Sequence, residues 1–137
     1  MTQQPDSPSG AASPEALLEA FVDALAANDA DRVAACYAND AVCFAMDEMV
    51  GLGPEFVRES WNAFFSVYTV REVRLTNTRL ECFGDTAAAW GLFQMLVDTV
   101  DEAEEIELHG RFTDVAKQFN QRWLFIADHA SVPLPPE

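Results

Sequence analysis

The stretch that decides the fold runs from His109 to Pro133, with the sequence HGRFTDVAKQFNQRWLFIADHASVP. Its residue pattern predicts two long strands joined by a tight turn at residues 120–121. Side chains alternate between the two faces of a strand, so His109, Arg111 and Thr113 are expected on one face of the first strand. This arrangement indicates a sheet whose polar residues are concentrated on one side.

The second strand of this hairpin adds another polar set. By the same alternation, its odd-numbered residues share one face, and they are Trp123, Phe125, Ala127, His129 and Ser131. If the two faces coincide, both histidines of the chain, an arginine and two hydroxyl groups line one concave surface. That surface is the candidate site, although the pattern does not name a substrate.

Composition narrows the class of protein. The 137 residues are enough for one domain, and 50% of them are hydrophobic, which is enough for a core. Eight Lys and Arg against 23 Asp and Glu give a net charge of −15. Such a surface repels phosphate backbones and anionic lipids, so we expect no nucleic-acid partner and no membrane-surface partner.

Other features point to a cytoplasmic protein without a cofactor. No apolar run approaches the roughly 20 residues of a membrane span, and no basic or apolar leader precedes Ala16. The odd number of cysteines, Cys36, Cys43 and Cys82, fits buried thiols in a reducing compartment, with a Cys36–Cys43 disulfide left open. No metal-ligand spacing or phosphate-binding loop occurs, so we expect neither metal nor cofactor.

The N-terminal half predicts helices. Residues 1–13 are rich in Pro, Ser and Gly and predict a flexible tail, before a helix that Ser13 caps and that ends near Ala27. A short second helix is expected from Ala30 to Tyr37. A third helix opens at residues 53–54, where Gly-Pro forms a turn and a helix start.

The C-terminal half predicts strands. After a short strand at residues 41–44, the apolar residues of Thr69–Phe83 change parity, which predicts a bulge near residues 76–79. Residues 86–100 are apolar on both faces and predict a central strand. The two strands of the opening stretch complete an antiparallel meander. A single domain is therefore expected over residues 14–133, followed by a short tail at 134–137.

With these residues in view, the chain resembles the nuclear-transport-factor-2-like (NTF2-like) superfamily, in its SnoaL-like and ketosteroid-isomerase-like branch. The resemblance implies an α+β, cystatin-like fold: a cone-shaped roll with three helices packed on a strongly bent antiparallel sheet of four to six strands. The outer face of such a sheet would still be partly apolar, so we expect a homodimer through the sheet face. The segments that carry the resemblance are 28–42, 53–58, 110–115, 122–123 and 128–133.

The catalytic residues of ketosteroid isomerases are not carried over. Their oxyanion-donating tyrosine falls on Phe21, which has no proton to donate. Their base falls on Ala45, with Asp47 two residues further on, and their protonated aspartate falls near Gly110. The resemblance therefore implies a different activity from steroid isomerisation.

Two other branches of the superfamily give weaker matches. Limonene epoxide hydrolases place an arginine between two aspartates, but Arg111 and Asp114 are three residues apart and should face opposite sides of a strand. Polyketide cyclases of the SnoaL type use acid and base residues inside the cone. His129 and Asp47 are candidates for such roles.

The candidate catalytic residues are His129, Arg111, Asp47 and His109. A histidine such as His129 titrates near neutral pH and transfers protons, whereas Arg111 would stabilise developing negative charge. The competing interpretation makes His129 a hydrogen-bonded core residue and Arg111 half of a structural ion pair. The candidate ligand-binding residues are Tyr37, Trp61, Trp90, Phe93, Trp123, Phe125, Thr113 and Ser131.

Two functions remain open from the sequence. The first is a cofactor-free acid/base enzyme that isomerises, cyclises or dehydrates a small apolar carbonyl or polyketide-like molecule. The second is a non-catalytic module of the same fold that binds a small ligand or dimerises. An open cavity of about 300 Å³ or more around His129, with His129, Arg111 and a carboxylate converging on it, would favour the enzyme. A cone plugged by Trp90, Phe93 or Trp61, with Arg111 paired internally, would favour the module.

Overall fold

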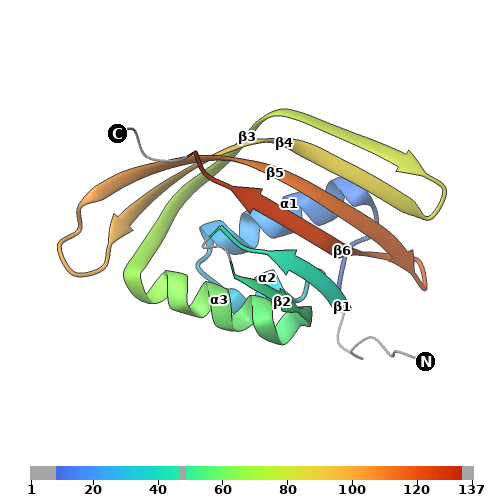
Figure 1. The fold of residues 1–137 in the computed structure, drawn as a ribbon, viewed down its shortest axis with the longest axis horizontal. Helices are drawn as coiled ribbons and strands as arrows, with labels where there is room; N and C mark the ends of the chain where they lie inside the picture. The colour runs from blue at the N-terminus through green and yellow to red at the C-terminus, as the bar shows by residue number, and fades with distance from the viewer. Residues whose placement is uncertain (1–8, 47–48, 134–137) are drawn as a thin grey trace.

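The computed structural model describes residues 9–46 and 49–133, which form three helices and one six-stranded sheet (Figure 1). The chain therefore has the predicted α+β architecture, with a strongly curved sheet that does not close into a barrel. The sheet arches over helix α1, and α3 lies across the opening below it. This arrangement leaves a hollow between the helices and the concave face.

Helices α1 and α2 begin where capping residues satisfy their first N–H groups. In α1 (Pro14–Ala26), the Ser13 hydroxyl accepts a hydrogen bond from the Ala16 N–H at 3.1 Å, and Pro14 occupies the first turn. In α2 (Ala30–Ala34), the Asp29 carboxylate accepts from the Arg32 N–H at 3.1 Å. The predicted starts of the first and second helices are thus confirmed.

Helix α3 (Gly53–Val67) starts at the predicted Gly-Pro step, where Gly53 has a φ of +78°. A Cβ at Gly53 would lie 2.5 Å from the Asn39 carbonyl oxygen, so the close approach to β1 needs glycine there. Helix α3 packs against α2 and β1 and presents one apolar side to the sheet. That side becomes a wall of the cavity.

The six strands lie in the order β2-β1-β6-β5-β4-β3. Strands β3 to β6 form the predicted antiparallel meander, whereas β1 runs parallel to β6 and pairs with β2 at the edge. Their bounds are β1 Tyr37–Phe44, β2 Val50–Leu52, β3 Tyr68–Phe83, β4 Thr86–Thr99, β5 Glu105–Phe119 and β6 Arg122–Ser131.

Bulges supply the bend of the sheet. The predicted bulge in β3 is confirmed: Thr76 pairs with Leu92 but Arg79 pairs with Trp90, so β3 carries one extra residue there. A second bulge in the same strand lies between Val70 and Glu72. A third, in β6, was not predicted and determines which side chains face the cavity.

The structure shortens the predicted second helix. Helix α2 ends at Ala34, and β1 begins at Tyr37 rather than at Ala41. Tyr37 pairs with Phe125 of β6 and is only 2% exposed, so burial against the sheet prevails over the local helical pattern.

Ala11, the three cysteines and the lengths of the helices also bear on expectations from the sequence. Ala11, placed by the sequence in the tail, forms an isolated bridge with Trp123 and is buried. Cys36, Cys43 and Cys82 are all free thiols, so the Cys36–Cys43 disulfide is not formed. No helix within residues 9–46 and 49–133 is long and apolar enough to cross a membrane.

Candidate functional site

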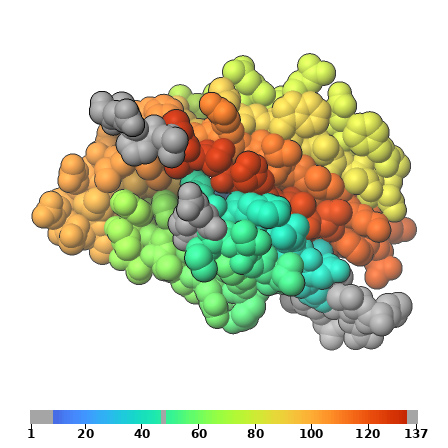
Figure 2. Space-filling model, viewed as in Figure 1, coloured from blue at the N-terminus to red at the C-terminus, as the bar shows by residue number. Residues whose placement is uncertain are grey.

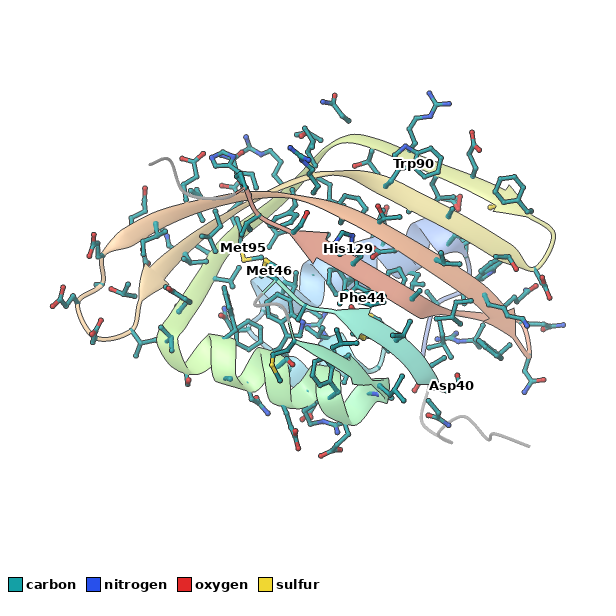
Figure 3. The ribbon with its side chains drawn as sticks, viewed as in Figure 1. Asp40, Phe44, Met46, Trp90, Met95 and His129 are labelled. Carbon is teal, nitrogen blue, oxygen red and sulfur yellow. The ribbon has the colours of Figure 1, made fainter. Side chains whose placement is uncertain are left out.

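The cone encloses an open cavity of about 480 Å³ between α1, α3 and the concave face of the sheet. This volume lies within the range of small-molecule sites. The wall is mostly aromatic and aliphatic, and it includes Met46 and Met95, which are labelled in Figure 3. The aromatic members of the wall are Phe21, Tyr37, Phe44, Phe56, Trp61, Phe64, Tyr68, Phe93 and Phe112.

Two carboxyl groups stand side by side in this apolar wall. Asp114 of β5 and Asp128 of β6 are directly opposite each other in the antiparallel register, and their side chains hydrogen-bond. The Tyr37 hydroxyl donates to Asp128 Oδ2 at 2.5 Å. Cys43 of β1 is the neighbour of Asp128 on its other side. The four side chains form one polar cluster at the cavity.

The surroundings of Asp114 favour the protonated form of its carboxyl group. Desolvation is the largest cause that raises the pKa of Asp114 well above its usual value, and the adjacent charge and hydrogen bond of Asp128 raise it further. A hydrogen bond from the His129 backbone opposes this shift only in part. Burial and the neighbouring carboxyl therefore favour the protonated form of Asp114, with the proton shared along the hydrogen bond between the two side chains.

The other two members of the cluster stay neutral. Burial is the main cause that raises the pKa of Tyr37 well above 10.0, and the nearby Asp128 and Asp114 add to it. Burial likewise raises the pKa of Cys43 to about 12, so its thiol is not a nucleophile at neutral pH. Tyr37 thus serves as a hydrogen-bond donor to Asp128.

One oxygen of the pair is left without a partner. Among the described residues, Asp114 Oδ1 is the buried side-chain oxygen or nitrogen that has no hydrogen bond. Asp114 is 4% exposed and belongs to the cavity wall. A buried acceptor without a donor is costly, so a group that donates to it would stabilise the folded protein.

Most of the catalytic residues expected from the sequence lie on the opposite side of the sheet. His109, Arg111, Thr113 and His129 are exposed, and none of them contributes to the cavity wall. The expected coincidence of the two strand faces is correct, since Thr113 pairs with His129 and Arg111 pairs with Ser131. The prediction that this face is concave is wrong.

The polar residues face outward because side chains alternate between the two faces of β5. The residues between the polar ones on β5, namely Gly110, Phe112, Asp114 and Ala116, are buried and face the cone, so their neighbours must face outward. A Cβ on Gly110 would lie 2.4 Å from the Phe93 ring, which shows how tightly the inner face is packed there.

The bulge in β6 explains the position of Trp123 and Phe125. Val115 pairs with Ala127 but Ala116 pairs with Phe125, so Ile126 is an extra residue that reverses the parity of the strand. Trp123 and Phe125 are consequently buried inside, whereas His129 and Ser131 stay on the outer face.

The structure places some of the predicted aromatic residues at the cavity and others away from it. Tyr37, Trp61 and Phe93 line the cavity. Trp90 is 38% exposed on the outer side of the sheet (Figure 3), away from the cavity that it was expected to line. Phe125 packs in the core against Tyr37, with ring centroids 5.4 Å apart. The remaining candidate, Asp47, lies outside the described residues.

The site residues that the sequence prediction missed are Asp114 and Asp128. A signal for Asp114 was present: Phe112 and Ala116, two positions away on either side, are apolar, so Asp114 had to share their inner face. An acid on an apolar face is a functional signal. Asp128 gave no such signal, because the bulge at Ile126 is not visible in a segment that is apolar on both faces.

Comparison with known proteins gives the family. The model of the SnoaL-like domain matches residues 15–135. The chain belongs to the SnoaL-like domain family. A search of curated proteins gave no match. In this SnoaL-like protein, Phe21 lines the cavity without a hydroxyl group to donate, and Gly110 of β5 has no space for a side chain, because an added Cβ would lie 2.4 Å from Phe93.

Solved structures share the fold over most of the chain. A candidate calcium/calmodulin-dependent protein kinase II association domain from Xanthomonas campestris is 19% identical, with a TM-score of 0.78, and 97% of this chain and 100% of that chain are covered. A hexachlorocyclohexane dehydrochlorinase is 19% identical, with a TM-score of 0.77 and coverages of 88% and 82%. A candidate scytalone dehydratase from Novosphingobium aromaticivorans is 12% identical, with a TM-score of 0.77 and coverages of 88% and 81%. At these identities the likeness establishes the NTF2-like fold alone.

Proposed function

We propose that the protein is a cofactor-free acid/base enzyme that acts on a small apolar carbonyl or polyketide-like molecule in the cone. The observation that supports this is the pair of adjacent carboxyls, Asp114 and Asp128, in the wall of an otherwise apolar cavity. Two titratable groups with different protonation states are the usual requirement for moving a proton in both directions. The proposal assigns to Asp128 the proton transfer that the sequence assigned to His129.

Each group has a distinct role in the proposed step. Asp128, as the carboxylate, takes the proton from the carbon next to the substrate carbonyl, and the C–H electron pair forms the double bond of an enol. Asp114, whose pKa is raised by burial, gives its proton to the carbonyl oxygen. The proton on Asp128 then returns to Asp114 through the hydrogen bond between them. Tyr37 orients Asp128 through its 2.5 Å hydrogen bond.

The electrostatics of the wall favour this neutral route. Among the described residues that line the cavity there is no Lys, Arg or His, so a free enolate would find no positive charge. Protonation of the oxygen by Asp114 avoids that charge. Isomerisation, cyclisation and dehydration next to a carbonyl all begin with this enolisation, so the three subclasses share the proposed step.

Solvent deuterium exchange tests the proposal whatever final product the reaction yields. A panel of apolar ketones, such as tetralones, decalones and cyclohexenones, is incubated with the protein in D2O, and deuterium uptake next to the carbonyl is followed by NMR. We expect the protein to accelerate uptake into at least one ketone, and Asp128→Asn to lower that rate by about 10²- to 10⁴-fold.

Asp40→Asn is the matched control, because it is the same chemical change at an exposed residue near the opposite end of β1 from Met46 (Figure 3). It should leave the rate unchanged. If no ketone exchanges, or if Asp128→Asn exchanges as fast as the parent protein, the enzyme proposal is wrong. The non-catalytic ligand-binding module, which the absent ketosteroid-isomerase residues favour, then takes its place.

We also propose that two copies associate through the outer face of the sheet. Trp90 and Leu92 are 38% and 40% exposed there, and Leu92 lies opposite Arg111 on β5. Large apolar side chains on an exposed sheet face are typical of an interface. Figure 2 shows the side of the molecule where β1 and β6 meet, and β3 and β4 continue this sheet at its upper edge.

Sedimentation velocity tests the dimer. We expect the parent protein to sediment as a dimer and Leu92→Glu to shift it to monomer, because a buried charge opposes association. Val50→Glu, at an exposed apolar residue of edge strand β2, should stay dimeric. A monomeric parent protein, or a Leu92→Glu dimer of unchanged affinity, would contradict this proposal.

A further inference from the structure

The cavity has an unusual balance of charge. Its wall holds two carboxyls, two phenols and one thiol, and the described lining residues include no cationic side chain. The titratable groups come from the strands: Tyr37 and Cys43 from β1, Tyr68 from the start of β3, and the carboxyls from β5 and β6. Helices α1 and α3 contribute only apolar or uncharged lining residues.

We propose that this cavity selects its ligand by charge, and that it binds apolar molecules bearing a protonated amine in preference to their neutral and carboxylate counterparts. The Asp114–Asp128 pair supplies the counter-charge, and the aromatic wall surrounds the apolar body. The inference rests on the proposed function for the choice of cavity. The inference goes beyond the proposed function by stating which ligand charge, positive rather than neutral or negative, the cavity prefers.

Three structural features support an ammonium ligand. The pair carries negative charge in a low-dielectric wall, where a charge-assisted hydrogen bond is strong. Asp114 Oδ1 has no donor, and an ammonium group brings three. Aromatic faces such as those of Trp61 and Phe64 attract a cation, whereas they offer nothing to an anion.

The same features exclude a carboxylate ligand. A carboxylate would lose its hydration on entering, would meet the negative charge of Asp128, and would find no Lys, Arg or His on the described part of the wall. The net charge of −15 further lowers the concentration of anions near the opening. Rejection of anions should therefore be stronger than the preference for an amine over an alcohol.

Binding of an ammonium group should also change the protonation of the two carboxyls. The positive charge favours ionisation of both carboxyls, so Asp114 releases the proton that burial makes it hold. Binding is then coupled to the release of up to about one proton. The ion pair also occupies Asp128, so a bound amine is a competitive inhibitor of the proposed proton transfer.

Calorimetry with three matched probes tests the inference: 2-naphthylmethylamine, 2-naphthylmethanol and 2-naphthoate, titrated into the full chain at pH 7. We expect the amine to bind at least about tenfold more tightly than the alcohol, and the carboxylate to show no heat of binding. Repeating the amine titration in phosphate and in Tris, whose ionisation enthalpies differ, measures the protons released. An amine that binds no more tightly than the alcohol, or a carboxylate that binds as tightly as the amine, overturns the inference.

Two variants and one control locate the charge. Asp128→Asn should remove the advantage of the amine over the alcohol, and Asp114→Asn should remove the proton release. Asp40→Asn changes net charge equally at an exposed residue and should alter neither. If Asp128→Asn fails to fold by circular dichroism, the ranking of probes on the parent protein and the Asp114→Asn proton count still decide. Proton release that persists in Asp114→Asn contradicts the assignment.

The outcomes separate this inference from the proposed function. If the amine ranking holds and no ketone exchanges deuterium, the proposed enzyme is wrong and the charge selection stands. If ketones exchange and the carboxylate binds as tightly as the amine, the enzyme stands and the charge selection is wrong.

Discussion

The two faces of the β5–β6 hairpin differ in almost every respect, although they are built from alternate residues of the same strands. The outer face carries His109, Arg111, Thr113 and His129, all exposed. The inner face carries apolar side chains and a pair of acids. The face richer in familiar catalytic residue types is thus the one turned away from the cavity.

The difference shows that the identity of a side chain matters less for chemistry than the medium around it. The histidine and arginine of the outer face are in water, where their charges are screened and solvated. Asp114 lies in the apolar wall, where burial, together with the adjacent Asp128, raises its pKa and favours its use as a proton donor. Alternation along a strand places these two situations one residue apart.

The largest effect that distinguishes the two faces should be on stability. Phe125 is 3% exposed and packs against Tyr37 and Phe21, with centroids 5.4 and 5.7 Å apart. We expect Phe125→Ala to lower the free energy of unfolding by about 3–5 kcal/mol, because it leaves a cavity in the core. His129→Ala, four residues further along the same strand, should change it by less than about 0.5 kcal/mol.

Urea denaturation monitored by circular dichroism measures both variants under the same conditions. Comparable losses for the two substitutions would mean that His129 is buried in solution, for example in the proposed dimer. Measurement of both variants above and below the concentration at which the dimer forms would then separate burial in the interface from burial in the monomer.

The fold was largely predictable from the sequence because its signals are local. Ser13 and Pro14 specified the start of α1, and a change of apolar parity within residues 69–83 specified the bulge in β3. The cone shape and the family followed from the resemblance. These features depend on neighbours in the chain, which the sequence displays directly.

The site was much less predictable, because it depends on which of the two faces of each strand points into the cavity. A shift of one residue moves a whole set of side chains to the other face. In β6 the residues from Trp123 to Ala127 are all apolar, so nothing in the sequence revealed the bulge at Ile126. In β5 such a signal was present, since Phe112 and Ala116, two positions away on either side of Asp114, are apolar. Histidine and arginine are common catalytic residues, and so the face that carries them was predicted to hold the site instead.

A smaller effect should appear in the pH dependence of stability, and it concerns the inner face alone. Burial and Asp128 raise the pKa of Asp114 in the folded protein, whereas in the unfolded chain an aspartate ionises near pH 4. Above about pH 4 the native state therefore binds more protons than the unfolded state, so the contribution of Asp114 to stability falls as the pH rises. It stops falling once the pH exceeds the folded-state pKa.

Asp114→Asn removes this ionisation and keeps an N–H donor for Asp128. The free energy of unfolding of the parent protein, minus that of the variant, should thus decline as the pH rises above about 4, with a slope that approaches about 1.4 kcal/mol per pH unit, until the pH passes the raised pKa of Asp114. Asp40→Asn, at an exposed residue, should give a difference that is nearly flat over the same range. Parallel stability curves for the parent protein and Asp114→Asn would show that Asp114 is ionised in the folded state. In that case the inner face would be an ordinary charged pair, and its contrast with the outer face would reduce to hydrophobicity.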